Sequence, residues 1–369
     1  MIPVCEPLLT NRDHELVTDC LRSGWISSAG KYIEEFESRW SAYCGMPFGI
    51  SVSNGTAALQ IAVELLDLQP GDEVILPSFT IISLALAVVR CAGVPVLVDS
   101  NPDDWQMNVA QIADRITPRT RAILVVHTYG HPAEMDPILE IARQHRLTVI
   151  EDAAEAHGAE YCGRKCGGLG DISVFSFYAN KLITTGEGGM VLVRDIRLVD
   201  RARSLRNLCF NPRRRFLHEE LGHNFRLTNL QAALGVAQFE RLEQTVTRKR
   251  EIAASYRREL QGTKNITFPV EKPWGKHVYW VCGLLVNGAI GPETHEVIAR
   301  LATRGIETRP FFLGMHEQPV FRRMGLFENQ NFPVAQRLAR QGLYLPNGLS
   351  LTDRQITEIC GHVKECLEP

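Results

Sequence analysis

The sequence has no surplus of charge of either sign and no apolar stretch long enough to cross a membrane. Its 40 basic and 42 acidic side chains leave a formal net charge of −2, so no overall field attracts nucleic acid or an anionic membrane. The longest apolar run, Ile81 to Val89, is far shorter than the roughly 20 residues that a membrane-spanning helix needs. The first residues also lack the basic and apolar regions of a signal peptide. We therefore expect a cytoplasmic protein that has neither nucleic acid nor membrane as a partner.

The ten cysteines form no C-x-x-C pair, the spacing shared by many redox and zinc sites. Several, including Cys91 and Cys282, lie in apolar runs, which fits a reducing compartment better than a disulfide framework. Cys162 and Cys166 flank a turn-like segment and would make half of a metal site. No second pair of ligands is apparent, and we expect no metal.

From about residue 50 to residue 195, short apolar runs rich in β-branched residues alternate with helical patterns. Nearly continuous apolar strands separated by helices are typical of a mainly parallel sheet covered by helices on both faces. The expected strands are 49–52, 73–77, 94–98, 122–126, 147–150 and 172–175, and the expected helices between them include 56–66 and 137–145.

A long helical pattern follows, with apolar residues at intervals of three and four over 229–260. It predicts a connector between a large domain, 1–245, and a smaller C-terminal α/β domain, 246–369. In the second domain we expect a strand over 278–282 and helices near 293–303, 334–342 and 352–367.

Ser53-Asn54-Gly55-Thr56 lies between a short strand and a helix. Glycine allows a close turn, and the first amides of a helix are unsatisfied, so the segment would suit a phosphate. A plain helix N-cap formed by Ser53 or Asn54 is the alternative. The segment matches neither G-x-G-x-x-G nor G-x-x-x-x-G-K-[ST], which speaks against the usual dinucleotide and P-loop folds.

Asp152 follows a buried strand, at the edge where open α/β sheets bind ligands. A carboxylate there would keep a pyridinium nitrogen protonated and strengthen the ring as an electron sink. Glu155 follows three residues later and would reach the same site, near a ring hydroxyl. An aspartate after a strand is otherwise a common helix cap.

Lys181 lies just past the strand that ends near Ser176 and before the glycine-rich turn Gly186-Glu187-Gly188-Gly189. A partly desolvated lysine near other cations has a lowered pKa and forms imines. The hydroxyl of Ser176 would donate to a phosphate. A single lysine in a loop is otherwise a solvated charge. Asn224 and Arg226 occupy alternate positions in the polar entry to the long helix, where Thr228 would be the cap.

Together these motifs resemble the nucleotide-sugar aminotransferases of the DegT/StrS group, which are fold-type-I pyridoxal-phosphate enzymes. The resemblance covers essentially the whole chain, with the motifs in order and at the spacing of the family. The segments that carry it are Asn54-Gly55-Thr56, Glu151-Asp152-Ala153-Ala154, Ser176-x4-Lys181, Gly186-Glu187-Gly188-Gly189 and Asn224-Phe225-Arg226.

The resemblance implies that Lys181 holds pyridoxal 5′-phosphate as a Schiff base and that Asp152 pairs with the pyridine nitrogen. Gly55, Thr56 and Ser176 would hold the phosphate. In the family, the asparagine that matches Asn224 reaches the phosphate from the partner subunit, which implies a homodimer with shared active sites. A related dehydratase group has histidine in place of Lys181, so the lysine favours amination over deoxygenation.

The chain departs from many relatives at two positions of the expected cofactor site. Ile81 stands where an aromatic residue often stacks on the ring, and Glu155 stands where glutamine is common. The second departure puts the hydrogen bonding at the ring hydroxyl in doubt, although the reaction is not affected.

A narrower likeness, outside the cofactor site, is to enzymes that move the amino group of L-glutamate to C4 of GDP-4-keto-6-deoxymannose for O-antigen or another glycan. Arg309 and His316 then become candidate contacts to the nucleotide sugar, with ordinary loop structure as the alternative. Rival interpretations are amination at C3 or C4 of a UDP- or dTDP-linked ketosugar and a cofactor-binding regulator without turnover. The segments that carry this likeness are 203–210, 278–281, 308–312 and 315–321.

Overall fold

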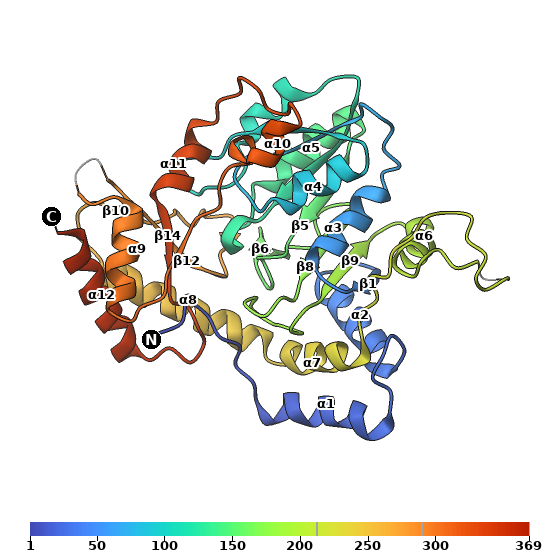
Figure 1. Cartoon of the computed structure of the whole chain (residues 1–369), viewed down its shortest axis with the longest axis horizontal. Coiled ribbons are helices and arrows are strands. Elements are labelled where there is room, and N and C mark those ends of the chain that lie inside the picture. Colours follow the sequence, from blue (N-terminus) through green and yellow to red (C-terminus); the bar gives the residue numbers. More distant parts are fainter. Residues whose placement is uncertain (212, 289–290, 369) are drawn as a thin grey trace.

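The computed structural model describes residues 1–211, 213–288 and 291–368. Its centre is a sheet of seven strands in the order β1-β9-β8-β5-β4-β2-β3. The six predicted strands of this region are all present, and their residues pair within the one sheet (Figure 1). The bounds are β1 Phe48–Val52, β2 Glu73–Pro77, β3 Val94–Val98, β4 Thr120–Val126, β5 Thr148–Asp152, β8 Ile172–Ser176 and β9 Gly189–Val193.

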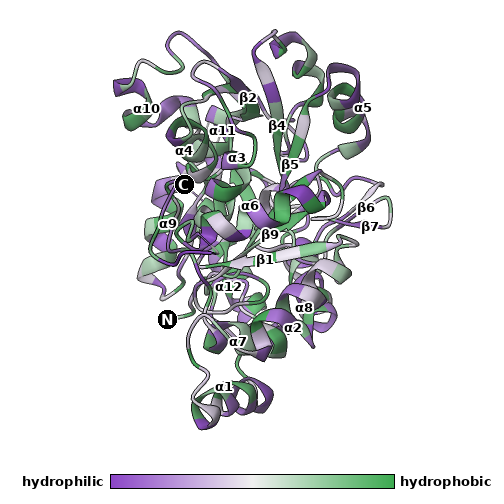
Figure 2. Cartoon of the chain, turned by 90° about the vertical axis from the view of Figure 1, so that its right-hand side faces the viewer, coloured by the Kyte–Doolittle hydropathy of each residue, from purple (hydrophilic) through white to green (hydrophobic). Residues whose placement is uncertain are grey.

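Five neighbouring strands of this sheet, β8-β5-β4-β2-β3, run parallel. The strand β9, which the sequence pattern did not single out, pairs antiparallel with both β8 and β1. The sheet is therefore mainly parallel, with the antiparallel strand β9 between β8 and the edge strand β1, and the predicted fold class is confirmed. Figure 2 shows the central strands coloured hydrophobic along most of their length, whereas the outer helices carry both colours.

Helices cover this sheet, and α3 together with the ends of the parallel strands defines where a ligand could bind. The helix α3 packs against β8 and β9, and α2 packs against β1. The carboxyl ends of parallel strands meet at one edge of a sheet, and α3 begins directly after β1. The bounds are α1 Asn11–Ser23, α2 Lys31–Tyr43, α3 Gly55–Glu64, α4 Ser83–Arg90, α5 Met135–His145 and α6 Ile196–Arg206.

The single helix predicted over 229–260 is in fact two helices, α7 (Asn229–Phe239) and α8 (Leu242–Glu259). Neither glycine nor proline stands at the join, Glu240–Arg241, which is why the apolar period gave no sign of a break. The helix α7 lies against α1 and α2, whereas α8 continues to the C-terminal part of the molecule (Figure 1).

The C-terminal part is built on a smaller sheet with the order β10-β12-β14-β13. Three of its helices, α9, α11 and α12, agree with those predicted from the pattern within one residue at each end, whereas α10 was not predicted. A third, short sheet, β11-β6-β7, lies at the side of the molecule. The remaining bounds are β6 Glu160–Tyr161, β7 Arg164–Lys165, β10 Ile266–Thr267, β11 Gly275–Lys276, β12 Cys282–Val286, β13 Arg309–Pro310, β14 Gly342–Leu345, α9 Thr294–Thr303, α10 Pro319–Arg323, α11 Pro333–Gln341 and α12 Asp353–Leu367.

The strand predicted over 278–282 is wrong for all but its last residue, because β12 begins at Cys282. The apolar residues before it are buried for another reason. Val278 donates its N–H to Gly130 O at 3.0 Å, and Tyr279 has a φ of 49°. The segment thus turns toward the large sheet instead of extending the small one.

The molecule has two apolar cores. One lies around the seven-stranded sheet and also includes buried residues between Phe311 and Leu338 of the C-terminal part, and the other lies around α8, α9 and α12. Ile2 packs against the second core, so the start of the chain contacts the C-terminal part. The division at 245/246 falls inside α8 and stays a prediction. Among the residues that the structure describes, no helix combines the length and apolar character needed to cross a membrane.

Candidate active site

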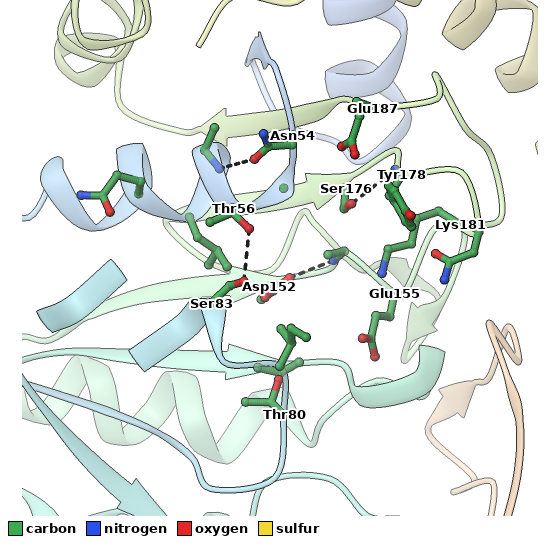
Figure 3. Close-up of a pocket in the computed structure, with 18 of the residues that line it drawn as sticks. Asn54, Thr56, Thr80, Ser83, Asp152, Glu155, Ser176, Tyr178, Lys181 and Glu187 are labelled. Atoms are coloured by element: carbon green, nitrogen blue, oxygen red, sulfur yellow. Dashed lines mark hydrogen bonds between the residues drawn. The ribbon is translucent and has the colours of Figure 1, made fainter. Parts of the chain in front are cut away.

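A cavity of about 640 Å³ opens where β5 and β8 end and α3 begins. Its wall draws on segments from residue 54 to residue 344, so both parts of the chain contribute. Figure 3 shows how the polar members lie around one space. The lining includes Asn54, Gly55, Thr56, Ile81, Asp152, Glu155, Ser176, Tyr178, Asn180, Lys181, Phe225, Trp280, Phe312 and Tyr344.

The N-terminus of α3 forms one end of the cavity. Asn54 caps the helix by accepting the N–H of Ala57 through Oδ1 at 2.8 Å. Within the described chain, the N–H groups of Gly55 and Thr56 make no hydrogen bond. A helix end with two free amides is a site for an anion. The cap and the phosphate site proposed from sequence are therefore compatible, because they use different amides.

Gly55 is required here by space. A Cβ at this position would lie 2.7 Å from Cβ of Ser176 and 3.1 Å from its Oγ. The glycine therefore lets the helix end come close to the Ser176 hydroxyl, which accepts only a long 3.4 Å bond from Tyr178 N. The amides and the hydroxyl converge on one small polar cup.

Asp152 is the last residue of β5 and is buried at the cavity wall. Its Oδ1 accepts one hydrogen bond, from Ala154 N at 3.0 Å. Burial raises the pKa of this carboxyl to about 6, against the opposing effects of the Ala154 N–H and Lys181. A cation placed against the other oxygen would restore the charged form, and the protonated nitrogen of a pyridine ring is such a cation.

Glu155 faces the same space from the turn that follows β5. Its Oε2 accepts the N–H of Tyr129 at 2.7 Å. Burial raises the pKa of the carboxyl, and the nearby Lys181 opposes that rise. The residue that the sequence marked as a departure from its relatives is therefore buried beside the lysine. Both of its protonation states are accessible near neutral pH.

Lys181 follows β8 on a loop and points its amine between Asp152 and Glu155 (Figure 3). Burial lowers the pKa of the amine, and the two carboxylates raise it. Behind the lysine loop, His157 donates from Nε2 to Ser176 O at 2.8 Å. Burial, together with the charge of Lys181, lowers the pKa of His157 to about 3. Burial outweighs the two carboxylates, so the pKa of the amine is lowered, which favours the neutral form that makes an imine. The sequence predicts cationic neighbours for this lysine, whereas the groups that raise its pKa here are acidic.

Glu151 precedes Asp152 and points to the opposite side of β5, as the two-residue period of a strand requires. It accepts hydrogen bonds from Leu169 N, Gly170 N and His127 Nε2 at 2.8–3.0 Å. Because His127 Nδ1 accepts the N–H of Ala133, its Nε2 carries a proton and has no lone pair for a metal. The buried group of His127, Glu151 and Cys166 therefore works as a scaffold under Asp152.

An aromatic wall faces these polar groups. It was not predicted as part of the site, although Trp280 and Phe312 lie in segments that the narrower likeness had marked. Tyr344 gave no signal in the sequence. Ile81, which is 40% exposed, also lines the cavity. The wall consists of Trp280, Phe312 and Tyr344, whereas Phe225 lies near the start of α3, where its carbonyl oxygen accepts the N–H of Ser53.

Three predicted residues do not line the cavity of the single chain. Asn224 is exposed and forms a bridge with Asn207. Arg309 is exposed on β13 and pairs with Glu307. His316 is buried, with Nδ1 2.7 Å from Ser78 Oγ and Nε2 3.1 Å from Gln336 Nε2. These bonds give His316 a packing role between the large sheet and the C-terminal part.

Pyridoxal phosphate carries an aldehyde, a ring nitrogen and a phosphate, and the cavity has a group suited to each of them. Lys181 suits the aldehyde, Asp152 the ring nitrogen, and the cup of Gly55, Thr56 and Ser176 the phosphate. The fold and the cavity together define an enzyme of the class that uses this cofactor.

Comparison with known proteins narrows the class. Residues 7–364 match the DegT/DnrJ/EryC1/StrS aminotransferase family, and the chain belongs to this family. It is 40% identical to the GDP-perosamine synthases of Caulobacter vibrioides and Escherichia coli O157:H7, over 99% of this chain and 98% of each relative. Among solved structures, the PLP-form of the putative sugar aminotransferase Spr1654 from Streptococcus pneumoniae superposes with a TM-score of 0.92. It is 25% identical, over 99% of this chain and 98% of that one.

Proposed function

We propose that this aminotransferase moves the amino group of L-glutamate to C4 of GDP-4-keto-6-deoxymannose, giving GDP-perosamine and 2-oxoglutarate. The observation that carries the proposal is the 40% identity to two GDP-perosamine synthases over nearly the full length of both chains. A relative that acts on a dTDP-linked sugar, from Streptomyces venezuelae, is 37% identical over 92% of this chain. The difference between these relatives is in coverage more than in identity, so the substrate must be tested directly.

The roles of the residues follow from their positions. Bound pyridoxal phosphate supplies an aldehyde that accepts the amino group and a ring that takes up electron density. With the cofactor bound, the amine of Lys181 would hold it through its aldehyde, and once glutamate has taken that place the freed amine would remove the proton from Cα of glutamate. In the second half of the reaction the same amine would take a proton from the aminated cofactor and deliver it to C4 of the sugar. Asp152 keeps the ring nitrogen protonated throughout, and Glu155 lies where it can exchange a proton with Lys181.

A second copy of the chain belongs to the same proposal. Phe225 lines the cavity, and Asn224, the residue before it, is exposed. We infer a homodimer in which Asn224 of each subunit reaches the phosphate cup of its partner. A cytoplasmic location, expected from the unpaired thiols, is also part of the proposal.

The experiment supplies the enzyme with pyridoxal phosphate and follows the visible absorbance of the bound cofactor. Glutamate should bleach the band, and GDP-4-keto-6-deoxymannose should restore it while an amino sugar of the expected mass appears. UDP- and dTDP-linked 4-ketosugars serve as matched competitors. Restoration by one of these at a higher kcat/KM would contradict the assignment to GDP. A band that glutamate never bleaches would contradict transamination itself.

A further inference from the structure

Trp280 makes a close contact with the amine of Lys181 that the roles above do not use. The Nζ atom lies 3.7 Å from the centroid of the indole ring. Trp280 is only 6% exposed and Lys181 is half-buried, so water screens the contact only in part. An ammonium over the face of tryptophan is the most favourable arrangement of a cation with an aromatic ring.

The same indole also fixes the loop that carries the lysine. Its Nε1–H donates to the carbonyl oxygen of Asn180, the residue before Lys181, at 2.8 Å. A single side chain therefore contacts the amine of Lys181 through its ring face and the main chain of the preceding residue through a hydrogen bond.

Trp280 is itself held in place from the side of the C-terminal part. The side-chain amide of Asn347 donates to the carbonyl oxygens of Tyr279 and Trp280, at 2.7 and 3.3 Å. Lys249, fully buried on α8, donates to Asn347 O. These bonds hold residues 278–281 in the turn that places the indole against the lysine.

We propose that Trp280 is a positioning residue, whose ring seats the amine of Lys181 whenever that amine is not bonded to the cofactor. The proposal rests on Lys181 being the cofactor lysine of the proposed function. A freed lysine side chain has several rotatable bonds and would otherwise sample many positions during the half-reaction in which it must move protons. With the indole in place, the amine stays within reach of the reacting atoms.

The charged and titratable groups around Lys181 set the background for a test. Asp152 ends β5, and Glu155 and His157 follow it. The two carboxylates raise the pKa of the lysine, burial lowers it, and His157 is neutral over the working range of pH. The ring face of Trp280 favours the ammonium form. Its removal should therefore lower the pKa of Lys181 by about one unit.

The test uses the full-length enzyme after conversion by glutamate, in which Lys181 is free. Trace acetylation with acetic anhydride is run at a series of pH values, and the peptide that contains Lys181 is quantified by mass spectrometry. The exposed Lys264 is the internal reference. For Trp280→Leu the pH at the midpoint of Lys181 acetylation should fall by about one unit. For Trp280→Phe, which keeps a weaker ring face, it should fall by about half of that. Trp274→Leu, a half-buried tryptophan outside the cavity, is the matched control and should leave the midpoint unchanged.

Identical midpoints in wild type and Trp280→Phe would overturn the proposal, and this variant carries the test if Trp280→Leu does not fold. An equal shift in Trp274→Leu would overturn it as well, because the effect would then be a general loosening of the protein. Failure of the proposed function gives a different result. Before glutamate is added, pyridoxal phosphate would then fail to protect Lys181 of the wild type from acetylation.

Discussion

The two parts of the molecule contribute different chemistry to one cavity. The large sheet supplies polar groups on short, rigid segments, namely the ends of β5 and β8 and the start of α3. The C-terminal part supplies aromatic side chains, Trp280, Phe312 and Tyr344, from three separate segments. The first set matches the atoms of a cofactor. In the second set, Trp280 contacts the amine of Lys181, whereas Phe312 and Tyr344 line the rest of the cavity. We therefore expect cofactor chemistry and substrate fit to be separable at Phe312 but not at Trp280.

The largest expected effect is that of Lys181→Ala. Without its amine no group of the cavity can hold the aldehyde and move the proton, and we expect kcat/KM to fall by at least about 10³-fold. Coupled measurement of 2-oxoglutarate release gives the rate. Lys264→Ala, at an exposed position, is the control and should behave as wild type. A Lys181→Ala enzyme within tenfold of wild type would end the proposed mechanism.

Gly55→Ala tests the sheet side of the comparison. The added methyl group would lie 2.7 Å from Ser176 Cβ, so the helix end must move away from the hydroxyl. We expect the dissociation constant for pyridoxal phosphate to rise about tenfold, or about 1.4 kcal/mol, in a spectroscopic titration. The KM for the nucleotide sugar, measured at saturating cofactor, should change little. A raised KM for the nucleotide sugar with unchanged cofactor affinity would contradict the assignment of the sheet side to the cofactor.

Phe312→Ala tests the aromatic side. The ring is half-buried, packs 5.3 Å from the ring of Tyr129 and lines the cavity. We expect the KM for the nucleotide sugar to rise about fivefold, from the loss of one aromatic contact. Cofactor affinity and the half-reaction with glutamate should stay as in wild type. A loss of cofactor affinity equal to that of Gly55→Ala would show that the aromatic side also determines cofactor binding.

Glu155→Gln tests the buried carboxyl through stability. Burial raises the pKa of Glu155, so the folded protein keeps this proton to a higher pH than the unfolded chain, whose carboxyl titrates near 4.5. The favourable contribution is thus present below pH 4.5 and is lost as pH rises toward the raised value. Glutamine has no charge to bury. The difference in Tm between the variant and cofactor-free wild type should therefore increase by about 2 °C in favour of the variant as the pH rises from 4.5 to 8. A constant difference across this range would contradict the assignment.

Gly361→Ala is the smallest change, and it lies far from both walls. The glycine is in the interior of α12, and a Cβ there would meet no atom within 4 Å. Alanine in a helix is more stable than glycine by about 0.5–1 kcal/mol. Thermal unfolding should therefore shift slightly upward with unchanged kinetics, and any loss of activity would point to coupling between α12 and the cavity.

The sequence predicted the sheet side of this comparison better than the aromatic side. The bounds of the strands 73–77 and 94–98 were predicted to the residue. Strands of a parallel sheet are buried on both faces, so they appear in the sequence as continuous apolar runs between turn residues. Asp152 and Lys181 were assigned to the site mainly by the family resemblance, with their positions near the ends of predicted strands as support. The roles given to the site residues stay predictions, whereas the meeting of all but Asn224, Arg309 and His316 in one cavity is observed.

The aromatic residues of the cavity could not be predicted from local sequence patterns. No period relates Trp280 to Tyr344, and the apolar pattern around Trp280 imitates a strand. His316 was expected to contact substrate, yet its bonds to Ser78 and Gln336 depend on how two distant loops pack. The break at Glu240–Arg241 likewise has no local signal. These features depend on tertiary packing, which the pattern of a single segment does not contain.

The most direct test of the central claim is reduction of the wild-type enzyme with borohydride in the presence of pyridoxal phosphate, followed by peptide mapping. Borohydride fixes the cofactor to the lysine that holds it. The account predicts a pyridoxyl group on Lys181 alone, removed when glutamate is added before the borohydride. A label on another lysine, or a label on Lys181 that glutamate does not prevent, would contradict it.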